Sequence, residues 1–143
     1  MAVIATPPFV AQSSGAEWII VYGDVVEFLA QTGPNACQTK SWFRQGEARG
    51  FRMTAINPAA GRRNGATELI VHIINGGRTV DVPIQDRQNE WQPERGFWIA
   101  RRDVSADAPI GAVRYRVTAK DPEARTGEFT PFEAQISQHA IVE

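Results

Sequence analysis

Three segments of the chain alternate between apolar and polar residues and predict β-strands: residues 51–55, 80–85 and 113–120. An alternation of period two places the apolar side chains on one face of a strand and the polar ones on the other. Antiparallel sheets with one face on the core and one in water give this pattern, whereas parallel sheets buried on both faces show continuous apolar runs. We therefore predict an antiparallel sheet.

Residues 69–74 break the alternation, because both faces of this segment are largely apolar. This pattern predicts a central strand whose second face is also covered. The sequence Asn-Gly-Gly at 75–77 follows directly, and these residues tolerate the positive φ that tight turns require. We predict a hairpin from about residue 67 to residue 85, in which Pro83 marks an edge position or a bulge.

Glycine, proline and asparagine separate short apolar segments along the rest of the chain, which has twelve glycines and nine prolines. The frequent turn-forming residues favour an all-β domain of many short strands. No stretch keeps the spacing of an amphipathic helix; residues 25–29 come nearest, but Gly23 and Gly33 confine them, which predicts a strand. Residues 1–16 are predicted to be a flexible leader or linker, and residues 17–143 the domain.

Length and charge limit the classes of function. A chain of 143 residues suffices for one domain with its own core, and it excludes a large enzyme. The formal net charge of -1 lacks the basic field on which nonspecific nucleic-acid binding relies. The longest apolar runs, at 18–22 and 69–71, are far shorter than the roughly 18 residues of a membrane helix. We expect neither nucleic-acid binding nor a transmembrane segment.

Cys37 is the only cysteine, which excludes an intrachain disulfide and a Cys-x-x-Cys metal pair. A reactive thiol would need a cation such as Lys40 or Arg44 to lower its pKa, and a small buried apolar side chain is the commoner role. One cysteine fits the cytosol and the periplasm alike. The opening residues lack the positive region of a signal peptide, so the protein is either cytosolic or Met1 replaces a removed leader.

The sequence offers few candidates for enzyme or metal chemistry. A nucleophilic triad needs a histidine base, and His72 and His139 are the only histidines. No serine lies in a Gly-x-Ser-x-Gly motif, no glycine-rich loop matches a phosphate loop, and the acidic loop 121–128 lacks the dense spacing of calcium ligands. A metal site would have to bring Cys37, His72 and His139 together in a spacing that matches no known pattern. We expect no catalysis, no metal and no cofactor.

Arginine dominates the basic residues. Lys40 and Lys120 are the only lysines among the fifteen Lys and Arg residues, so thirteen are arginine. The pairs at 62–63 and 101–102, together with Arg114 and Arg116 on one strand face, would make a local surface that recognises anions. Neighbouring Asp and Glu residues cancel much of the field, which favours ordinary solvated faces.

Tryptophan is frequent, with four residues in the chain. Trp42 and Trp98 lie in apolar surroundings and are predicted to anchor the core or its rim. Trp91 lies in a polar loop, and exposed aromatic residues in loops are common binding residues. The candidate binding residues are therefore Trp91, Arg87 and Arg95.

Several short motifs from Phe43 onward are distinctive. They are Phe43-Arg-Gln-Gly-Glu, Phe51-Arg-Met, Phe97-Trp98, the stretch 104–121, and the stretch 125–132 followed by Ser137-Gln138. These motifs resemble those of a family of immunoglobulin-like β-sandwich domains from bacterial exported proteins, mostly of unassigned function. The Ala-Pro-x-Gly-x-(apolar)-x-Tyr pattern within 104–121 is similar to that of the family's penultimate strand. The likeness covers about two thirds of the chain.

The resemblance implies an immunoglobulin-like antiparallel β-sandwich of about seven strands with Greek-key connections. It implies a corner role for Tyr115, whose hydroxyl would bond to the backbone. The chain lacks the inter-sheet cysteine pair of antibody domains, which excludes a covalently pinned core. The resemblance further implies export to the periplasm or beyond, with the leader removed.

A sandwich fold hosts unrelated functions, so two functional hypotheses stay open. The first is a non-catalytic module that contacts another protein or a neighbouring domain, or acts as a structural spacer. The alternative is an accessory domain that binds a sugar or an anion through Trp91, Arg87 and Arg95. Exposed edge strands allow a monomer or a weak homodimer.

Overall fold

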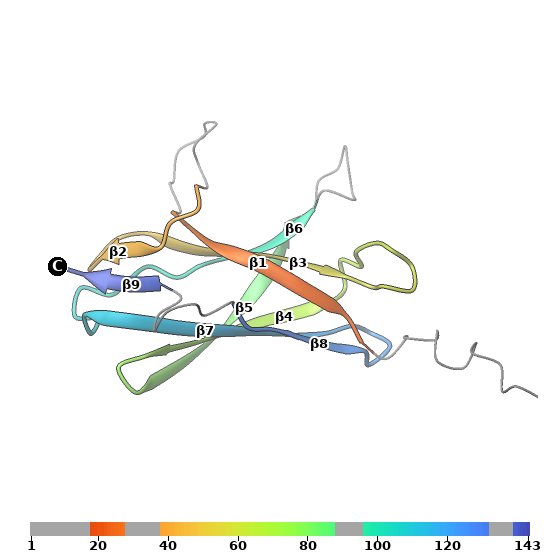
Figure 1. The fold of residues 1–143 in the computed structure, drawn as a ribbon. Coiled ribbons are helices and arrows are strands. Elements are labelled where there is room, and N and C mark those ends of the chain that lie inside the picture. The colour runs from red at the N-terminus through yellow and green to blue at the C-terminus, as the bar shows by residue number, and fades with distance from the viewer. Residues whose placement is uncertain (1–17, 28–37, 88–95, 132–138) are drawn as a thin grey trace, which may run out of the picture.

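The computed structural model describes residues 18–27, 38–87, 96–131 and 139–143. These residues form nine β-strands in one curled mixed sheet (Figure 1), which confirms the predicted all-β fold class. Among them there is no helix of the length and apolarity needed to cross a membrane. The strands are β1 (Ile20–Glu27), β2 (Trp42–Arg44), β3 (Arg49–Ile56), β4 (Glu68–Asn75), β5 (Arg78–Arg87), β6 (Phe97–Arg101), β7 (Gly111–Lys120), β8 (Thr126–Phe129) and β9 (His139–Val142).

The strand order is β1-β3-β6-β5-β4-β7-β9-β2, and β8 pairs with β7. Every pair is antiparallel except β2 with β9, which is parallel. The sequence predicts about seven strands, all of them antiparallel. The difference arises partly from β2 and β9, which are three and four residues long and therefore too short to show a period of two.

β5 connects the two halves of the sheet. Its residues 78–84 pair with β4, whereas residues 85–87 pair with β6. The strand thus leaves one half and joins the other, so the sheet curls around its inner face (Figure 1). Pro83 lies where β5 pairs on one side only, and its missing N–H therefore disrupts no second ladder. The strand itself lies between β4 and β6, so the predicted edge holds only for this stretch of β5.

The predicted hairpin forms between β4 and β5. Its two central residues, Gly76 and Gly77, have φ angles of 57° and 78°, which is the positive φ pair that a two-residue hairpin turn needs. β4 lies between β5 and β7, so the prediction of a central strand is confirmed. The predicted cover of its second face is wrong: Ile70 and Ile74 are 36% and 41% exposed. Polar side chains of the neighbouring strands lie on the same face, which is exposed to solvent.

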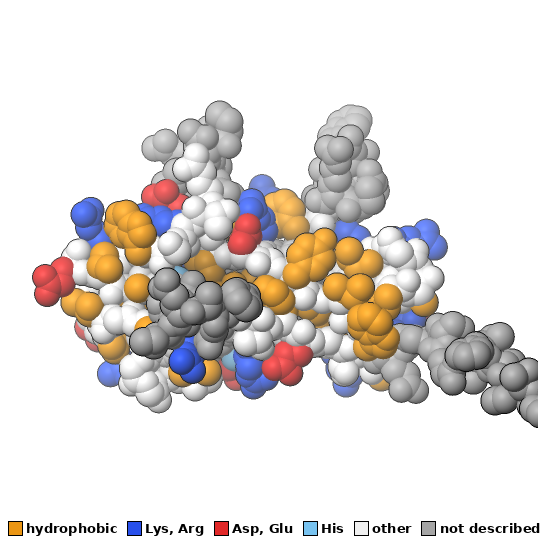
Figure 2. All heavy atoms as spheres, viewed as in Figure 1, with side chains coloured by type: hydrophobic (Ala, Val, Ile, Leu, Met, Phe, Trp, Pro, Cys, Tyr) orange, Lys and Arg blue, Asp and Glu red, His pale blue; other side chains and the backbone are white. Residues whose placement is uncertain are grey.

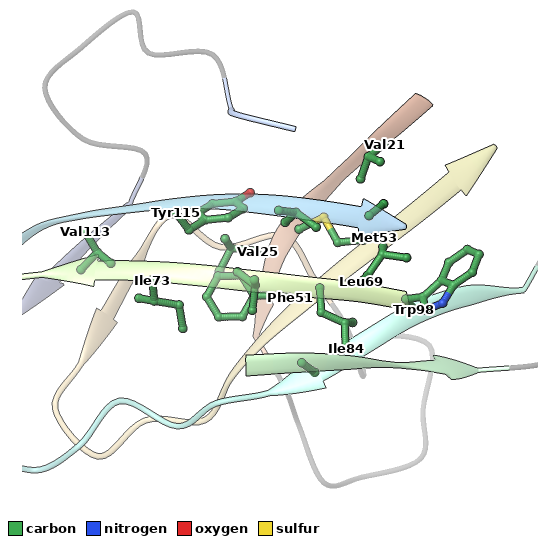
Figure 3. Packing of buried hydrophobic residues seen from close by; sticks show 14 of the residues in the cluster. Val21, Val25, Phe51, Met53, Leu69, Ile73, Ile84, Trp98, Val113 and Tyr115 are labelled. Atoms are coloured by element: carbon green, nitrogen blue, oxygen red, sulfur yellow. The ribbon is translucent and has the colours of Figure 1, made fainter. Parts of the chain in front are cut away.

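The core fills the space between the two halves of the sheet (Figure 3). Trp98 is buried, as the sequence predicts, and its indole Nε1–H donates to the Thr67 carbonyl at 3.0 Å. Trp42 is exposed at the rim, where the Lys40 ammonium lies 4.5 Å from its ring centroid. The same buried cluster includes residues of β1, β3, β4, β5 and β7, among them Val21, Val25, Phe51, Met53, Leu69, Ile73, Ile84, Val113 and Tyr115.

Candidate functional site

One residue of the predicted binding set lies within the described part of the chain. Arg87 is the last residue of β5, is exposed, and lies opposite Phe97 of β6. Trp91 and Arg95 lie outside the described residues. Of the predicted binding residues, only Arg87 can therefore be located, at the end of β5 beside β6.

His72 makes hydrogen bonds on the outer face of β4. Its Nδ1 is 2.7 Å from Asp81 Oδ1, and its Nε2 is 2.9 Å from Thr118 Oγ1. This is the acid, histidine and hydroxyl order of a nucleophilic triad. However, β7 pairs with β4 on one side and with β8 on the other at this point. The ladders use the backbone N–H groups around Thr118, so this stretch has no oxyanion hole. The geometry favours a cross-strand polar network.

His139 lies inside the core. The rings of Phe43, Phe51 and Tyr115 meet its imidazole edge to face, with centroids 6.0, 6.2 and 5.9 Å away. Burial, together with the positive charge of Arg49, lowers the pKa of His139 to about 3. The imidazole is therefore neutral at neutral pH, and its Nε2 accepts a hydrogen bond from Arg49 Nη1 at 3.2 Å.

The two histidines do not converge. His72 is on the outer face of the sheet and His139 is in its interior, while Cys37 lies outside the described residues. Across the described part of the chain, no three His, Cys, Asp or Glu side chains gather in a group that would hold a metal ion.

Asp121 organises the loop that the sequence marks as acidic. Its Oδ1 accepts the backbone N–H of Glu123 at 3.0 Å and of Arg125 at 2.9 Å, and its Oδ2 accepts from Arg125 Nε at 2.6 Å. Burial raises the pKa of Asp121, but the bonds from Arg125 and the backbone outweigh it and hold the pKa below its usual value. The carboxylate is thus engaged in shaping the β7–β8 turn.

The arginine pairs predicted to form one anion surface separate in the structure. Arg63 forms a partly buried ion pair with Asp86, while Arg62 is exposed. Arg101 pairs with Asp103 through Nε at 2.7 Å. Arg116 lies 3.6 Å from Glu128 on the outer face of β7. Carboxylates therefore neutralise much of this positive charge locally, as the sequence indicates.

An apolar strip runs along the outer side of β1. Trp18, Ile20 and Tyr22 are 51%, 38% and 49% exposed. They alternate with Ile19 and Val21, which are buried in the core, so the three large side chains share one face of the strand. Figure 2 shows hydrophobic side chains gathered over this part of β1.

The strip continues across two neighbouring strands. Ile20 lies opposite Ile56 of β3, and Arg52 of β3 lies opposite Ile99 of β6. Directly opposed residues in an antiparallel pair point to the same face. We call this surface the β1 face. Its apolar members are Trp18, Ile20, Tyr22, Ile56, Phe97 and Ile99, and all of them are at least partly exposed.

One ion pair and one hollow give the β1 face a defined shape. Arg52 binds Asp24 with two parallel bonds, Nε to Oδ1 at 3.0 Å and Nη2 to Oδ2 at 2.7 Å. A hollow of about 430 Å³ lies beside this pair, between Tyr22 and Phe97. The carboxylate and guanidinium neutralise one another, so the floor of the face carries little net charge.

Sequence reasoning did not select these residues. Trp18 to Tyr22 is apolar at every position, and comparing the length of this run with that of a membrane helix does not reveal an exposed strand face. A strand with apolar residues on both faces can bury only one face in the core of its own domain, so the other face lacks an apolar neighbour. The unbroken apolar run therefore indicates an exposed apolar surface on the outer side of β1.

No protein-family model matches the chain, and no curated protein is significantly similar to it in sequence.

Proposed function

We propose that the chain is a non-catalytic interaction module whose β1 face docks against another protein or a neighbouring domain. The observation that carries this proposal is the alignment of Trp18, Ile20 and Tyr22 on one exposed strand face. Contiguous exposed apolar patches of this kind mark interaction sites in soluble domains. Tryptophan and tyrosine are also the residues that contribute most binding energy at protein interfaces.

The shape of the β1 face supports a protein partner. Its apolar residues come from three adjacent strands, and such a sheet surface matches a flat apolar surface better than a small solute. The Asp24–Arg52 pair is internally neutralised, with hydrogen bonds of 3.0 and 2.7 Å. A partner therefore needs no charged group at the centre of the contact.

We further propose an immunoglobulin-like β-sandwich from an exported bacterial protein. Two ladders support the topology: β3 pairs with β6, and β4 pairs with β7. The chain thus passes between the two halves of the sheet after β3 and again after β6, as Greek-key connections do. The Ala-Pro-x-Gly pattern that starts at Ala108 leads directly into β7, although two short strands, β8 and β9, follow it. The resemblance to the family also supports export.

Site-specific photo-crosslinking in the cells that produce the protein tests the interaction. A photoreactive amino acid replaces Tyr22 on the β1 face, or Ile70 on the opposite outer face as a matched control. Ile70 is 36% exposed, which makes it accessible without altering the core. We expect a discrete crosslinked protein from position 22 that disappears when Ile20→Lys is added, and no such product from position 70.

The same experiment separates an interaction module from a spacer. A crosslink from position 70 alone, or no discrete product from position 22, would contradict docking through the β1 face. Fractionation of the cells before analysis tests export, because the proposal expects the crosslinked species outside the cytoplasm.

A further inference from the structure

A cavity of about 600 Å³ opens at one end of the core, away from the β1 face. It lies where the start of β3, the β4–β5 hairpin, β9 and the segment after β6 meet (Figure 1). Its volume is in the range of small-molecule sites. The residues around it divide into a basic group, Arg49, Arg78, Arg101 and Arg102, and an apolar group that includes Ile73, Val80, Val104 and Ala108.

The charge of the lining is strongly positive. Asp103 is the one carboxylate among the lining residues, and it pairs with Arg101 at 2.7 Å. Four arginines against one aspartate leave three positive charges around the cavity. Arg78 and Arg102 make no ion pair with any described carboxylate. An anion entering the cavity would therefore meet unneutralised guanidinium groups.

Arg49 is the innermost of these arginines and is 5% exposed. Buried charged side chains are normally paired with an opposite charge. The guanidinium of Arg49 instead donates to two neutral acceptors, the Arg102 carbonyl at 3.1 Å and His139 Nε2 at 3.2 Å. Burial, and then the nearby charge of Arg102, lower the pKa of Arg49 to about 10. Within the described residues, Arg49 forms no ion pair with a carboxylate. The nearby charge of Asp103 offsets only part of the lowering of its pKa, and Arg49 lines an open cavity.

The remaining lining restricts the kind of anion. Ile73, Val104 and Ala108 belong to the buried core and supply an apolar wall. Asn75 and Ser105 add neutral polar groups. A bare inorganic ion would leave the apolar wall without contact, whereas an anion with a compact apolar part would use both halves of the lining.

We propose that this cavity binds a small organic anion, with a carboxylate or phosphate group against Arg49, Arg78 and Arg102 and a compact apolar part against Ile73, Val80 and Val104. Guanidinium groups bind both kinds of oxyanion through paired, charge-assisted hydrogen bonds. The site is separate from the β1 face, and neither proposal depends on the other.

Isothermal titration of the full chain tests this proposal with benzoate, hexanoate and phenyl phosphate as probes. Benzyl alcohol serves as the neutral counterpart and inorganic phosphate as the anion without an apolar part. We expect at least one of the three organic anions to bind at least about tenfold more tightly than benzyl alcohol and inorganic phosphate. The comparison of benzoate with phenyl phosphate identifies the preferred oxyanion. Binding should weaken as ionic strength rises.

Four variants locate the site without disturbing the core. Arg78→Gln and Arg102→Gln remove one exposed lining charge each, and Arg62→Gln removes an exposed charge elsewhere. We expect each lining variant to weaken binding about tenfold and Arg62→Gln to leave it unchanged. Ser105→Trp narrows the cavity without changing its charge and should also weaken binding. The proposal is wrong if none of the three organic anions binds, or if Arg62→Gln weakens binding as much as Arg78→Gln.

Discussion

Arg49 Nη1 and His139 Nε2 lie 3.2 Å apart inside the core, so two basic side chains contact one another directly. The contact is favourable only when the imidazole is neutral, because the guanidinium donates to its Nε2 lone pair. A protonated His139 would place two positive charges side by side in an apolar interior. His139 Nδ1 is also buried without a hydrogen-bond partner among the described residues, so protonation gains no compensating bond there.

This contact predicts that acid destabilises the fold. The folded pKa of His139 is about 3, against an ordinary value of 6.5. Between these values the unfolded chain binds a proton that the folded chain does not, so the free energy of unfolding falls as the pH falls below 6.5. The loss should reach about 2 kcal/mol between pH 7 and pH 5. Urea unfolding at both pH values measures it.

His139→Gln provides the control for this pH dependence. Glutamine keeps an acceptor for Arg49 but does not titrate. The variant should therefore lose much less stability between pH 7 and pH 5 than the natural protein, whatever its stability at pH 7. An equal loss in both proteins would show that other groups cause the pH dependence.

The shielding of the ion pair between Arg63 and Asp86 predicts a large loss of stability when the pair is broken. Both side chains are mostly shielded from water, and the Arg63 guanidinium stacks 4.3 Å from the Trp98 ring centroid. Asp86→Ala leaves the largely shielded arginine without its partner, which should cost about 2 kcal/mol of stability or more. Asp103→Ala breaks the half-exposed pair with Arg101 and should cost much less, because water screens that pair. Similar losses for the two variants, measured by urea unfolding, would contradict this difference.

The positive φ of Ala124 predicts that glycine at this position would stabilise the fold. It is the described non-glycine residue with a positive φ, 64°, in the β7–β8 turn. A side chain in this left-handed region costs about 1–2 kcal/mol, which glycine avoids. Glycine also loses more chain entropy on folding, so Ala124→Gly should raise the free energy of unfolding by about 0.5–1 kcal/mol. Ala66→Gly, at a turn residue without positive φ, should lower it. Destabilisation by both variants would refute the strain at Ala124.

The parts of the fold that follow from local patterns could be predicted from the sequence. β5 and β7 are long enough to show the alternation, and Gly76 and Gly77 supply a turn that few other residues permit. The parallel pairing of β2 with β9 depends on two short segments that lie far apart along the chain. No local pattern reports such a pairing, because its stability comes from tertiary packing.

The candidate surfaces were harder to predict for the same reason. The Arg49–His139 contact joins residues 90 positions apart, and the basic cavity gathers arginines from three separate segments. The residues of the β1 face also come from three strands. In the sequence, Tyr22 and Phe97 are indistinguishable from core aromatic residues, because a strand pattern does not show which apolar face meets the core when both faces are apolar.

The affinity of the protein captured from position 22 tests the central claim most directly. Its dissociation constant should be measured for the natural chain, for Tyr22→Lys, and for Ile70→Lys on the opposite outer face, with urea unfolding to confirm that each variant is folded. Docking through the β1 face predicts at least about a thirtyfold loss of affinity for Tyr22→Lys, as loss of an interface hot spot gives, and less than about a threefold change for Ile70→Lys. Equal effects of the two variants on a folded chain would contradict it.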